Sequence, residues 1–528
     1  MILSVLSSVV LISLAGTHVA ASTRDQFPFV TETQEDFYEF KWPIRRVAVI
    51  GAGVSGLIAY RELTEAGFDT VKIFERDEIP GGVWHYTDEL PDDAPIPNLD
   101  PVVGDFEPSF PPQGMSLPYE QFHFDDAKER FRKHRAPHAV WKSLTSNVPA
   151  SMMHFTGLPF TPETSFHIPQ QTLCRYIRSA YSYYGINSND RNENASYSTR
   201  VELVDKRYDA EGNERGWTLT LKKLTTLGPL LSREEWWTED FDAVVVATGT
   251  FNAPHIPNIP GLAEWKIRFP QTISHSREYR SPEKFANSSV LVVGAGPSAT
   301  GVSADLQSSV AANYLSLRVG LSLPRFVHVS DLSITAERQV GNALQFLQLL
   351  KDGYHNSSWQ EDGTSVRPLI TDGTHYRSLY RDFLYIEEPT LGFVNMNLGI
   401  VTWTHGDYTA LALAKIWSGK ARLPSQDLMW QDHYRELTKR GGYSKQFPLL
   451  GAPHHSSYIA FYSGWLNSAA AEFGGKMIDG MPKDFIPAII SWQRDLFYNT
   501  NPVQIPPDFP TALLDEPVDV LHWMTGRY

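Results

Sequence analysis

The stretch Val47-Ala-Val-Ile-Gly51-Ala-Gly53-Val-Ser-Gly56 decides the fold, because it joins a β-branched run to a glycine-rich turn and then to a segment with helical periodicity. This is the strand–turn–helix context in which Gly-x-Gly-x-x-Gly binds a dinucleotide. Its glycines let the backbone turn tightly and approach a pyrophosphate, whose charge meets the positive end of the helix. A second stretch, Val290-Leu-Val-Val-Gly294-Ala-Gly296-Pro-Ser298-Ala299, repeats the arrangement. Two such stretches predict two nucleotides, and a flavin reduced by a nicotinamide is the commonest reason to hold both.

The first glycine-rich stretch shows more of the features of a dinucleotide site than the second. A second strand, Val71-Lys-Ile-Phe-Glu75, ends in a carboxylate at the ~20-residue spacing that suits a ribose hydroxyl. The alternative is a solvated strand-end carboxylate. A further buried strand, residues 241–249, ends in Thr-Gly. The residues predicted to contact the flavin nucleotide are Gly51, Gly53, Ser55, Gly56, Glu75, Gly82, Val83, Trp84, Thr248 and Gly249, and those for the second nucleotide are Gly294, Gly296, Ser298 and Ala299.

Composition excludes other classes. The 528 residues are 42% hydrophobic and 20% charged, which is ordinary for a globular protein of two or three domains. The net charge of −14 argues against a nucleic-acid partner. The single cysteine, Cys174, which we interpret as a core residue on a helix, excludes a dithiol–disulfide reductase, so flavin electrons must go to oxygen or directly to a substrate. His454-His455 lacks a third ligand nearby, and we expect no metal site.

The N-terminus predicts a targeting segment. An apolar run from Ile2 to Ala15 precedes small residues at 19–21, and it is shorter than the ~20 residues that span a bilayer. We expect a cleaved signal peptide and a place in the secretory pathway, in the endoplasmic reticulum lumen or outside the cell. The alternative is an N-terminal membrane anchor. We expect no other membrane span. Asn-x-Ser sequons suited to a glycoprotein stand at Asn194, Asn287 and Asn356.

The chain resembles the flavin-containing monooxygenases, within the class B flavoprotein monooxygenases, from about Val47 to Gly475. Phe269-Pro-Gln-Thr-Ile-Ser-His275-Ser-Arg-Glu-Tyr279 is similar to the family signature Phe-x-Gly-x-x-x-His-x-x-x-(Tyr/Phe), with Gln271 in place of the glycine. The resemblance implies that His275 and Tyr279 orient the linker between the nucleotide domains and that His275 belongs to the cofactor site, although a core histidine that holds the linker is the alternative. Tyrosine at the last position favours oxygenation of nitrogen or sulfur over Baeyer–Villiger oxidation.

Two other segments carry the resemblance. Val140-Trp-Lys-Ser-Leu-Thr-Ser-Asn147-Val-Pro is similar to the family segment whose asparagine sits beside the flavin, so the resemblance implies a catalytic and cofactor-binding Asn147, although a turn residue before proline is the alternative. Ala421-Arg-Leu-Pro-Ser425 resembles a late segment of the flavin domain. The second nucleotide domain differs more from the family pattern than the first. We place its second strand at Phe326–Ser330. The resemblance implies a basic residue after this strand to bind the 2′-phosphate of NADPH, but none follows here. Arg318 and Arg325 are the alternatives for that role.

The predicted fold is α/β with two Rossmann-like dinucleotide-binding domains, the NAD(P) domain being inserted into the FAD domain. We expect a signal peptide at 1–21, an arm at 22–45, the first part of the FAD domain at 46–262, the NADPH domain at 263–375, and a return to the FAD domain with a C-terminal region at 376–528.

The resemblance implies that NADPH and O2 are used to oxygenate a small-molecule nitrogen or sulfur through a C4a-hydroperoxyflavin, with FAD carrying the difficult chemistry. Three alternatives remain open from the residues alone: an FAD oxidase that releases hydrogen peroxide without NADPH, a Baeyer–Villiger monooxygenase, and a flavoprotein scaffold without activity.

Overall fold

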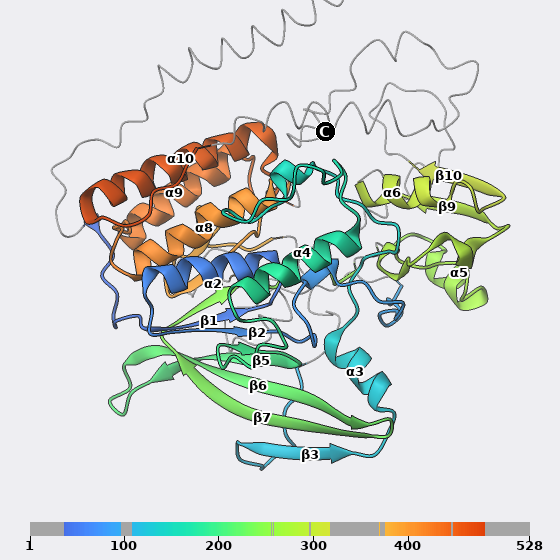
Figure 1. Ribbon diagram of the computed structural model, residues 1–528, viewed down its shortest axis with the longest axis horizontal. Helices are drawn as coiled ribbons and strands as arrows, with labels where there is room; N and C mark the ends of the chain where they lie inside the picture. The colour runs from blue at the N-terminus through green and yellow to red at the C-terminus, as the bar shows by residue number, and fades with distance from the viewer. Residues whose placement is uncertain are drawn as a thin grey trace, which may run out of the picture.

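The computed structural model describes residues 36–96, 108–254, 256, 258–294, 297–316, 369, 375–444 and 447–480. Its framework is a seven-stranded sheet (Figure 1). In spatial order its strands are β11 (Leu379–Tyr380), β12 (Leu384–Tyr385), β13 (Leu391–Phe393), β8 (Ala243–Val246), β1 (Arg46–Ile50), β2 (Thr70–Phe74) and β4 (Ala195–Ser196).

The central strands are parallel and in level register. Ile50 at the end of β1 lies opposite Phe74 of β2 and Val246 of β8, and Val246 lies opposite Phe393 of β13. Ligands of open α/β sheets bind outside the carboxyl ends of the strands. The level ends therefore bring the turns after β1, β2, β8 and β13 to one shared edge.

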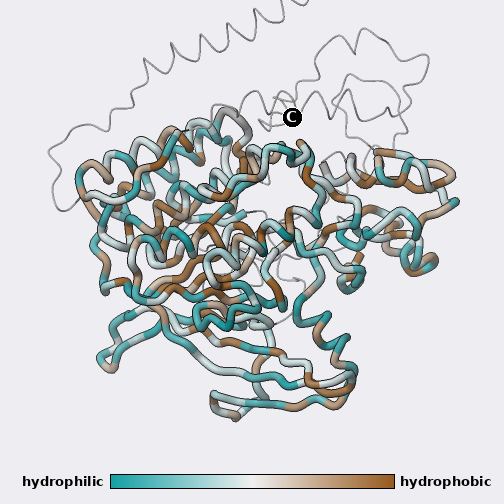
Figure 2. The backbone as a smooth tube through the Cα atoms, viewed as in Figure 1, coloured by the Kyte–Doolittle hydropathy of each residue, from teal (hydrophilic) through white to brown (hydrophobic). Residues whose placement is uncertain are grey.

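The sheet is buried on both faces, which explains why β1 is apolar at consecutive positions. Val47 and Val49 pack into a core with the helices, whereas Ala48 and Ile50 pack into a second core with the strands of another sheet. Figure 2 shows hydrophobic stretches along this interior and hydrophilic ones around the outer loops.

Helices cover one face and a second sheet covers the other (Figure 1). The α-helices are α2 (Val54–Ala66), α3 (Ala127–Arg135), α4 (Gln170–Tyr183), α5 (Leu262–Arg268), α6 (Pro297–Leu306), α8 (Thr402–Trp417), α9 (Gln426–Lys439) and α10 (Gly451–Phe473). Short 3₁₀ turns are η2 (Gly82–Trp84), η3 (Ala150–Met152), η4 (Ser276–Glu278) and η5 (Pro282–Phe285). Among the helices of these described residues, none combines the length and apolarity needed to cross a bilayer.

The second sheet is antiparallel, in the order β3 (Tyr119–His123), β7 (Leu231–Phe241), β6 (Glu214–Gly228) and β5 (Thr199–Tyr208). Its strands β5 and β6 form an antiparallel hairpin. The edge strand β3 and helix α3 lie in the chain between η2 and the segment that carries Asn147.

A separate two-stranded parallel sheet forms the second nucleotide unit, with β9 (Ser289–Val293), α6 and β10 (Ala312–Ser316) in Rossmann order. The prediction of Phe326–Ser330 as its second strand is wrong, because β10 directly follows α6 and pairs with β9. Residues 326–330 lie outside the described residues. Phe326–Ser330 has a higher strand propensity than Ala312–Ser316. A segment nevertheless takes its place in a sheet through its pairing partners and not through propensity alone. With β10 in this place, Arg318 follows the strand by two residues in the sequence.

Candidate cofactor sites and the cleft between them

The turn after β1 needs glycine for two different reasons. Gly51 has φ +106°, and a Cβ there would lie 2.7 Å from the Ala247 carbonyl oxygen. A Cβ on Gly56 would lie 2.0 Å from the carbonyl oxygen of Gly51 itself. Both positions therefore build the turn. Gly53 differs, because the nearest protein atom to an added Cβ is the Cα of Gly82 at 3.6 Å. The space beside Gly53 is left for a ligand.

The N-terminus of α2 presents an open positive pole at this turn. Gly53 is its N-cap residue, no side chain caps the helix, and its first turn contains no acidic residue. The first-turn N–H groups and the helix dipole therefore favour an anion here. The fully buried Tyr181 of α4 donates a hydrogen bond to the Gly53 carbonyl oxygen at 2.9 Å and fixes the turn from behind. The cradle fits the pyrophosphate of FAD.

Glu75 is buried, which rules out the solvated strand-end carboxylate. Its Oε2 accepts the Ala52 N–H at 2.6 Å and its Oε1 accepts the Asp77 N–H at 2.8 Å. Burial is the largest influence and raises the pKa of the carboxyl, while the two backbone hydrogen bonds oppose that rise. Each oxygen keeps a further lone pair, so acceptance of a ribose hydroxyl stays a prediction that this geometry permits.

The Gly81–Trp84 turn packs directly on the first glycine turn. Gly82 has φ +55°, and a Cβ there would come within 2.9 Å of the Gly53 Cα. Cys174 of α4 lies against this turn and is half-buried, so its interpretation as a core residue is wrong. The buried face of α4 includes Leu173, Ile177, Ala180 and Tyr181, and Cys174 stands beside that face. Burial raises the pKa of its thiol.

The other strand ends complete the same edge. Thr248 and the exposed Gly249 (φ +68°) follow β8. The Ser55 hydroxyl accepts a hydrogen bond from Asn395 Nδ2 at 2.9 Å. Asn395 follows β13, a strand of three residues. No sequence signal marked Asn395, because β13 is too short to show a pattern.

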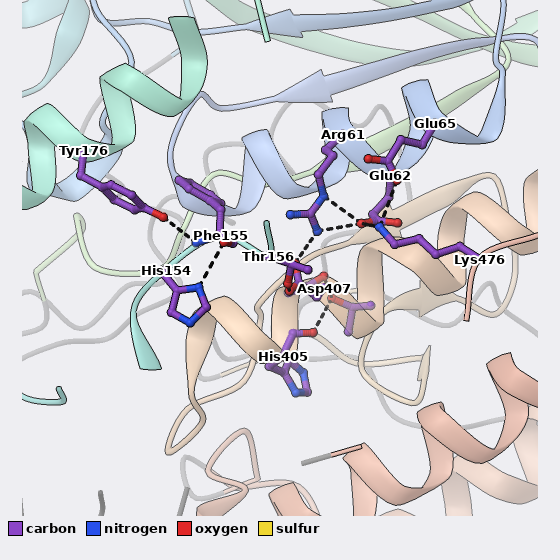
Figure 3. A network of polar contacts seen from close by, with 12 residues as sticks. Arg61, Glu62, Glu65, His154, Phe155, Thr156, Tyr176, His405, Asp407 and Lys476 are labelled. Carbon is purple, nitrogen blue, oxygen red and sulfur yellow. Dashed lines mark hydrogen bonds and ion pairs between the residues drawn. The ribbon is translucent and has the colours of Figure 1, made fainter. Parts of the chain in front are cut away.

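Asn147 is exposed on a segment that is fixed on both sides. Ahead of it, Ser146 is buried; its hydroxyl donates to the Val148 carbonyl oxygen at 2.8 Å and accepts the Ile168 N–H at 2.9 Å. Behind it, Thr156 donates to the Asp407 carboxylate at 2.5 Å, and Asp407 pairs with the buried Arg61 of α2 (Figure 3). The segment is thus tied to the helix that opens at the first glycine turn.

The same polar network extends to the end of the described chain. Arg61 also pairs with Glu62, whose Oε1 lies 2.7 Å from Lys476 Nζ (Figure 3). Opposite charges alternate through this network, so the buried charges are compensated.

The second glycine turn lies against the Asn147 segment. Gly294 has φ +129°, Ala299 is buried and Ser298 is partly exposed, whereas Gly296 falls outside the described residues. A Cβ on Gly301 of α6 would lie 3.0 Å from the Trp141 ring. Trp141 therefore packs on the helix that opens at the second turn.

A cleft lies between the two nucleotide units. Its lining residues are Ala139, Trp141, Phe251, Asn252, Ala253, His275, Ser276, Arg277, Ser298 and Val302. His275 accepts the Arg277 N–H on Nδ1 and caps η4, which agrees with a linker-orienting role. Arg277 is buried and donates to the carbonyl oxygens of Asn252 and Asp92. Its charge beside Ser298 suits nucleotide phosphates.

Sequence reasoning missed Arg277, Asn252 and Trp141 as cleft residues. They come from three distant segments that only the fold brings together.

Comparisons with known proteins point to one family. Residues 123–328 match a family model described as flavin-binding monooxygenase-like, and residues 49–99 match an NAD(P)-binding Rossmann-like domain. The flavin-containing monooxygenase iboF of Amanita muscaria is 40% identical over 89% of this chain and 98% of its own length. Senecionine N-oxygenase of Tyria jacobaeae is 26% identical over 74% of this chain and 76% of its own.

The fold has solved counterparts. The S-allyl-L-cysteine S-oxygenase of Allium sativum superposes with a TM-score of 0.57 at 21% identity, covering 92% of this chain and 99% of its own. The two Rossmann-like units predicted from the glycine motifs are therefore confirmed. With its paired dinucleotide turns and the extent of its likeness to iboF, the chain belongs to the flavin-containing monooxygenase family and acts as an oxidoreductase with FAD and NADPH.

Proposed function

We propose that this protein oxygenates a soft nitrogen or sulfur atom of a small molecule, with NADPH as reductant and O2 as the oxygen source. The observation that carries the proposal is the cleft between the two nucleotide units, where residues that follow β8 meet the buried Arg277 and the N-terminal residue Ser298 of α6. NADPH bound at this cleft would lie beside the turn after β8, on the edge where we place the flavin. The names of the N-oxygenase and S-oxygenase relatives support nitrogen or sulfur as the target.

Bound FAD supplies the redox and oxygen-activating chemistry. The chain's own residues position and shield it. The open N-terminus of α2 would hold the pyrophosphate of FAD, and Glu75 would accept a ribose hydroxyl. Gly82 leaves room for its own turn to pack on Gly53. Arg277 and Ser298 would face the phosphates of NADPH. Asn147 would donate a hydrogen bond at the flavin. No side-chain nucleophile is needed, because the oxygen atom reaches the substrate from the cofactor side.

The reaction type is tested by a substrate panel. Tyr279 closes the linker signature, and its hydroxyl donates to Asp305 of α6 at 2.6 Å while its ring packs near Trp141. Tyr279 thus holds the linker against α6. It indicates the nitrogen- or sulfur-oxygenating branch of the family but takes no part in the reaction itself. We expect oxygen incorporation into thioethers or secondary amines, measured by mass with ¹⁸O2, and none into cyclic ketones. Ester formation from ketones with untouched thioethers and amines would overturn this assignment.

One observation favours the alternative of an FAD oxidase that works without NADPH. The apolar N-terminal run would direct the chain out of the cytosol, and NADPH is scarce outside the cytosol. We propose that residues 1–21 are a cleaved signal peptide that directs the chain into the secretory pathway, with Asn194, Asn287 and Asn356 as glycosylation candidates, of which Asn356 lies outside the described residues. Asn287 is exposed and Asn194 partly so. Expression in a eukaryotic host should give a mature N-terminus near residue 22 and a mass that falls on glycosidase treatment. An intact Met1 on a membrane-bound protein would favour the anchor instead.

A further inference from the structure

A short acidic segment follows the Gly81–Trp84 turn, which packs on the first glycine turn and which we call the flavin turn. We call residues 86–93, which follow Gly82–Trp84 and His85, the acidic strap. On one side the strap is held by α3. Arg132 donates to the Leu90 carbonyl oxygen at 2.7 Å and to Asp92 Oδ1 at 2.6 Å, and Arg135 Nε lies 3.4 Å from Glu89 Oε2. Helix α3 therefore fixes the outer side of the strap.

The inner side of the strap is held by the linker between the nucleotide units. Arg280 Nε and Nη2 donate to the Glu89 carbonyl oxygen at 3.1 and 2.8 Å. Its Nη1 donates to the carbonyl oxygens of Arg277 and Tyr279 at 2.8 and 3.0 Å. Arg277 Nη2 donates to the Asp92 carbonyl oxygen at 2.5 Å. Two guanidinium groups thus bind the backbone of the strap, where a fork-shaped donor fits better than a point charge.

Arg280 also marks the meeting point of three elements. Its own carbonyl oxygen accepts the Lys142 N–H at 2.9 Å, five residues before Asn147. Its neighbour Tyr279 binds Asp305 on α6. Arg280 is only 8% exposed, and burial lowers its pKa to about 10, so it stays charged at neutral pH. The strap, the segment that leads to Asn147 and, through the neighbouring Tyr279, the second nucleotide unit therefore meet at Arg280.

We propose that Arg280 is a positioning residue, which sets the distance between the second nucleotide unit and the flavin turn through the acidic strap. This inference rests on the proposed function, because hydride transfer from NADPH is the step that depends on that distance. A misplacement of about 1 Å can cost ~10²-fold in rate. The pyrophosphate cradle at Gly53 does not contact Arg280, so the flavin stays bound when Arg280 is changed.

The test compares Arg280→Gln and Arg280→Lys with Arg130→Gln. Arg130 lies on α3 and pairs with Asp125 and Glu234, away from the strap. We expect FAD content close to wild type in all three proteins, and a lower melting temperature in the Arg280 variants alone, because they lose buried hydrogen bonds. The flavin reduction rate at saturating NADPH should fall tenfold or more in Arg280→Gln, and less in Arg280→Lys, which keeps the charge but loses the planar fork of the guanidinium group. Reduction by dithionite should be unchanged, and Arg130→Gln should match wild type.

A wild-type reduction rate in Arg280→Gln, or an effect on the KM for NADPH alone, would overturn the inference. Loss of FAD in the Arg280 variants would also overturn it, since the residue would then hold the flavin and not the domain. If Arg280→Gln does not fold, the Lys variant decides. Failure of NADPH to reduce the wild-type protein would instead contradict the proposed function itself.

Discussion

A Gly53→Val protein is expected to fold and to purify colourless. The Cβ would meet only the Gly82 Cα, at an ordinary contact distance of 3.6 Å, so the protein itself accommodates it. The two added methyl groups instead fill the space above the N-terminus of α2 and block close approach of a pyrophosphate. We expect FAD affinity to fall by at least about 100-fold, roughly 3 kcal/mol. Absorbance of the purified protein in the visible flavin band measures it.

The matched control is Gly464→Val on α10. Gly464 is exposed and an added Cβ there meets nothing within 4 Å, so this variant should stay yellow. Gly56→Val is the opposite extreme, since its Cβ would lie 2.0 Å from a carbonyl oxygen and should prevent folding of the turn. Full flavin occupancy in folded Gly53→Val would remove this turn from the FAD site.

An Asn147→Ala protein should bind FAD and be reduced by NADPH, but should lose coupling between NADPH oxidation and product. The side chain is exposed, and the segment around it is fixed by Ser146 and Thr156, so truncation leaves the fold intact. Loss of one well-placed donor at a reacting group costs about 10²–10³-fold in catalysis. We expect at least a tenfold rise in hydrogen peroxide released per product formed, measured alongside NADPH consumption.

Asn213→Ala is the control for that variant. Asn213 is an exposed asparagine in the β5–β6 hairpin, bonded to Asp209 and far along the chain from any cofactor residue. It should show wild-type coupling. Unchanged coupling in Asn147→Ala would show that Asn147 does not act at the flavin.

Much of the flavin unit is predictable because its signals are local. The glycines at 51 and 56 are demanded by contacts within a few residues or with the adjacent strand β8, and β-branched runs precede both turns. The strand β10 was missed because Ala312-Asn-Tyr-Leu-Ser has weak strand propensity and gains its place by pairing with β9. The strands β11 to β13 are two or three residues long, below the length at which alternation can be recognised.

The cleft could not be predicted in the same way. Arg277, Asn252 and Trp141 are separated by more than a hundred residues at the extremes and converge only in the folded protein. The carbonyl oxygens that bind Arg277 and Arg280 carry no sequence signal at all, since every residue has one. A buried arginine beside a linker is visible only in the structure.

The central claim is that this chain passes electrons from NADPH to its flavin and oxygen to a substrate. Anaerobic stopped-flow mixing of the yellow protein with NADPH tests it most directly. The account predicts that the visible flavin band bleaches at a rate that saturates with NADPH. Subsequent mixing with oxygen and a thioether or secondary amine should give close to one oxygenated product per flavin. A flavin that neither NADPH nor NADH bleaches, but that an amine or thioether alone reduces before oxygen releases peroxide, would contradict it.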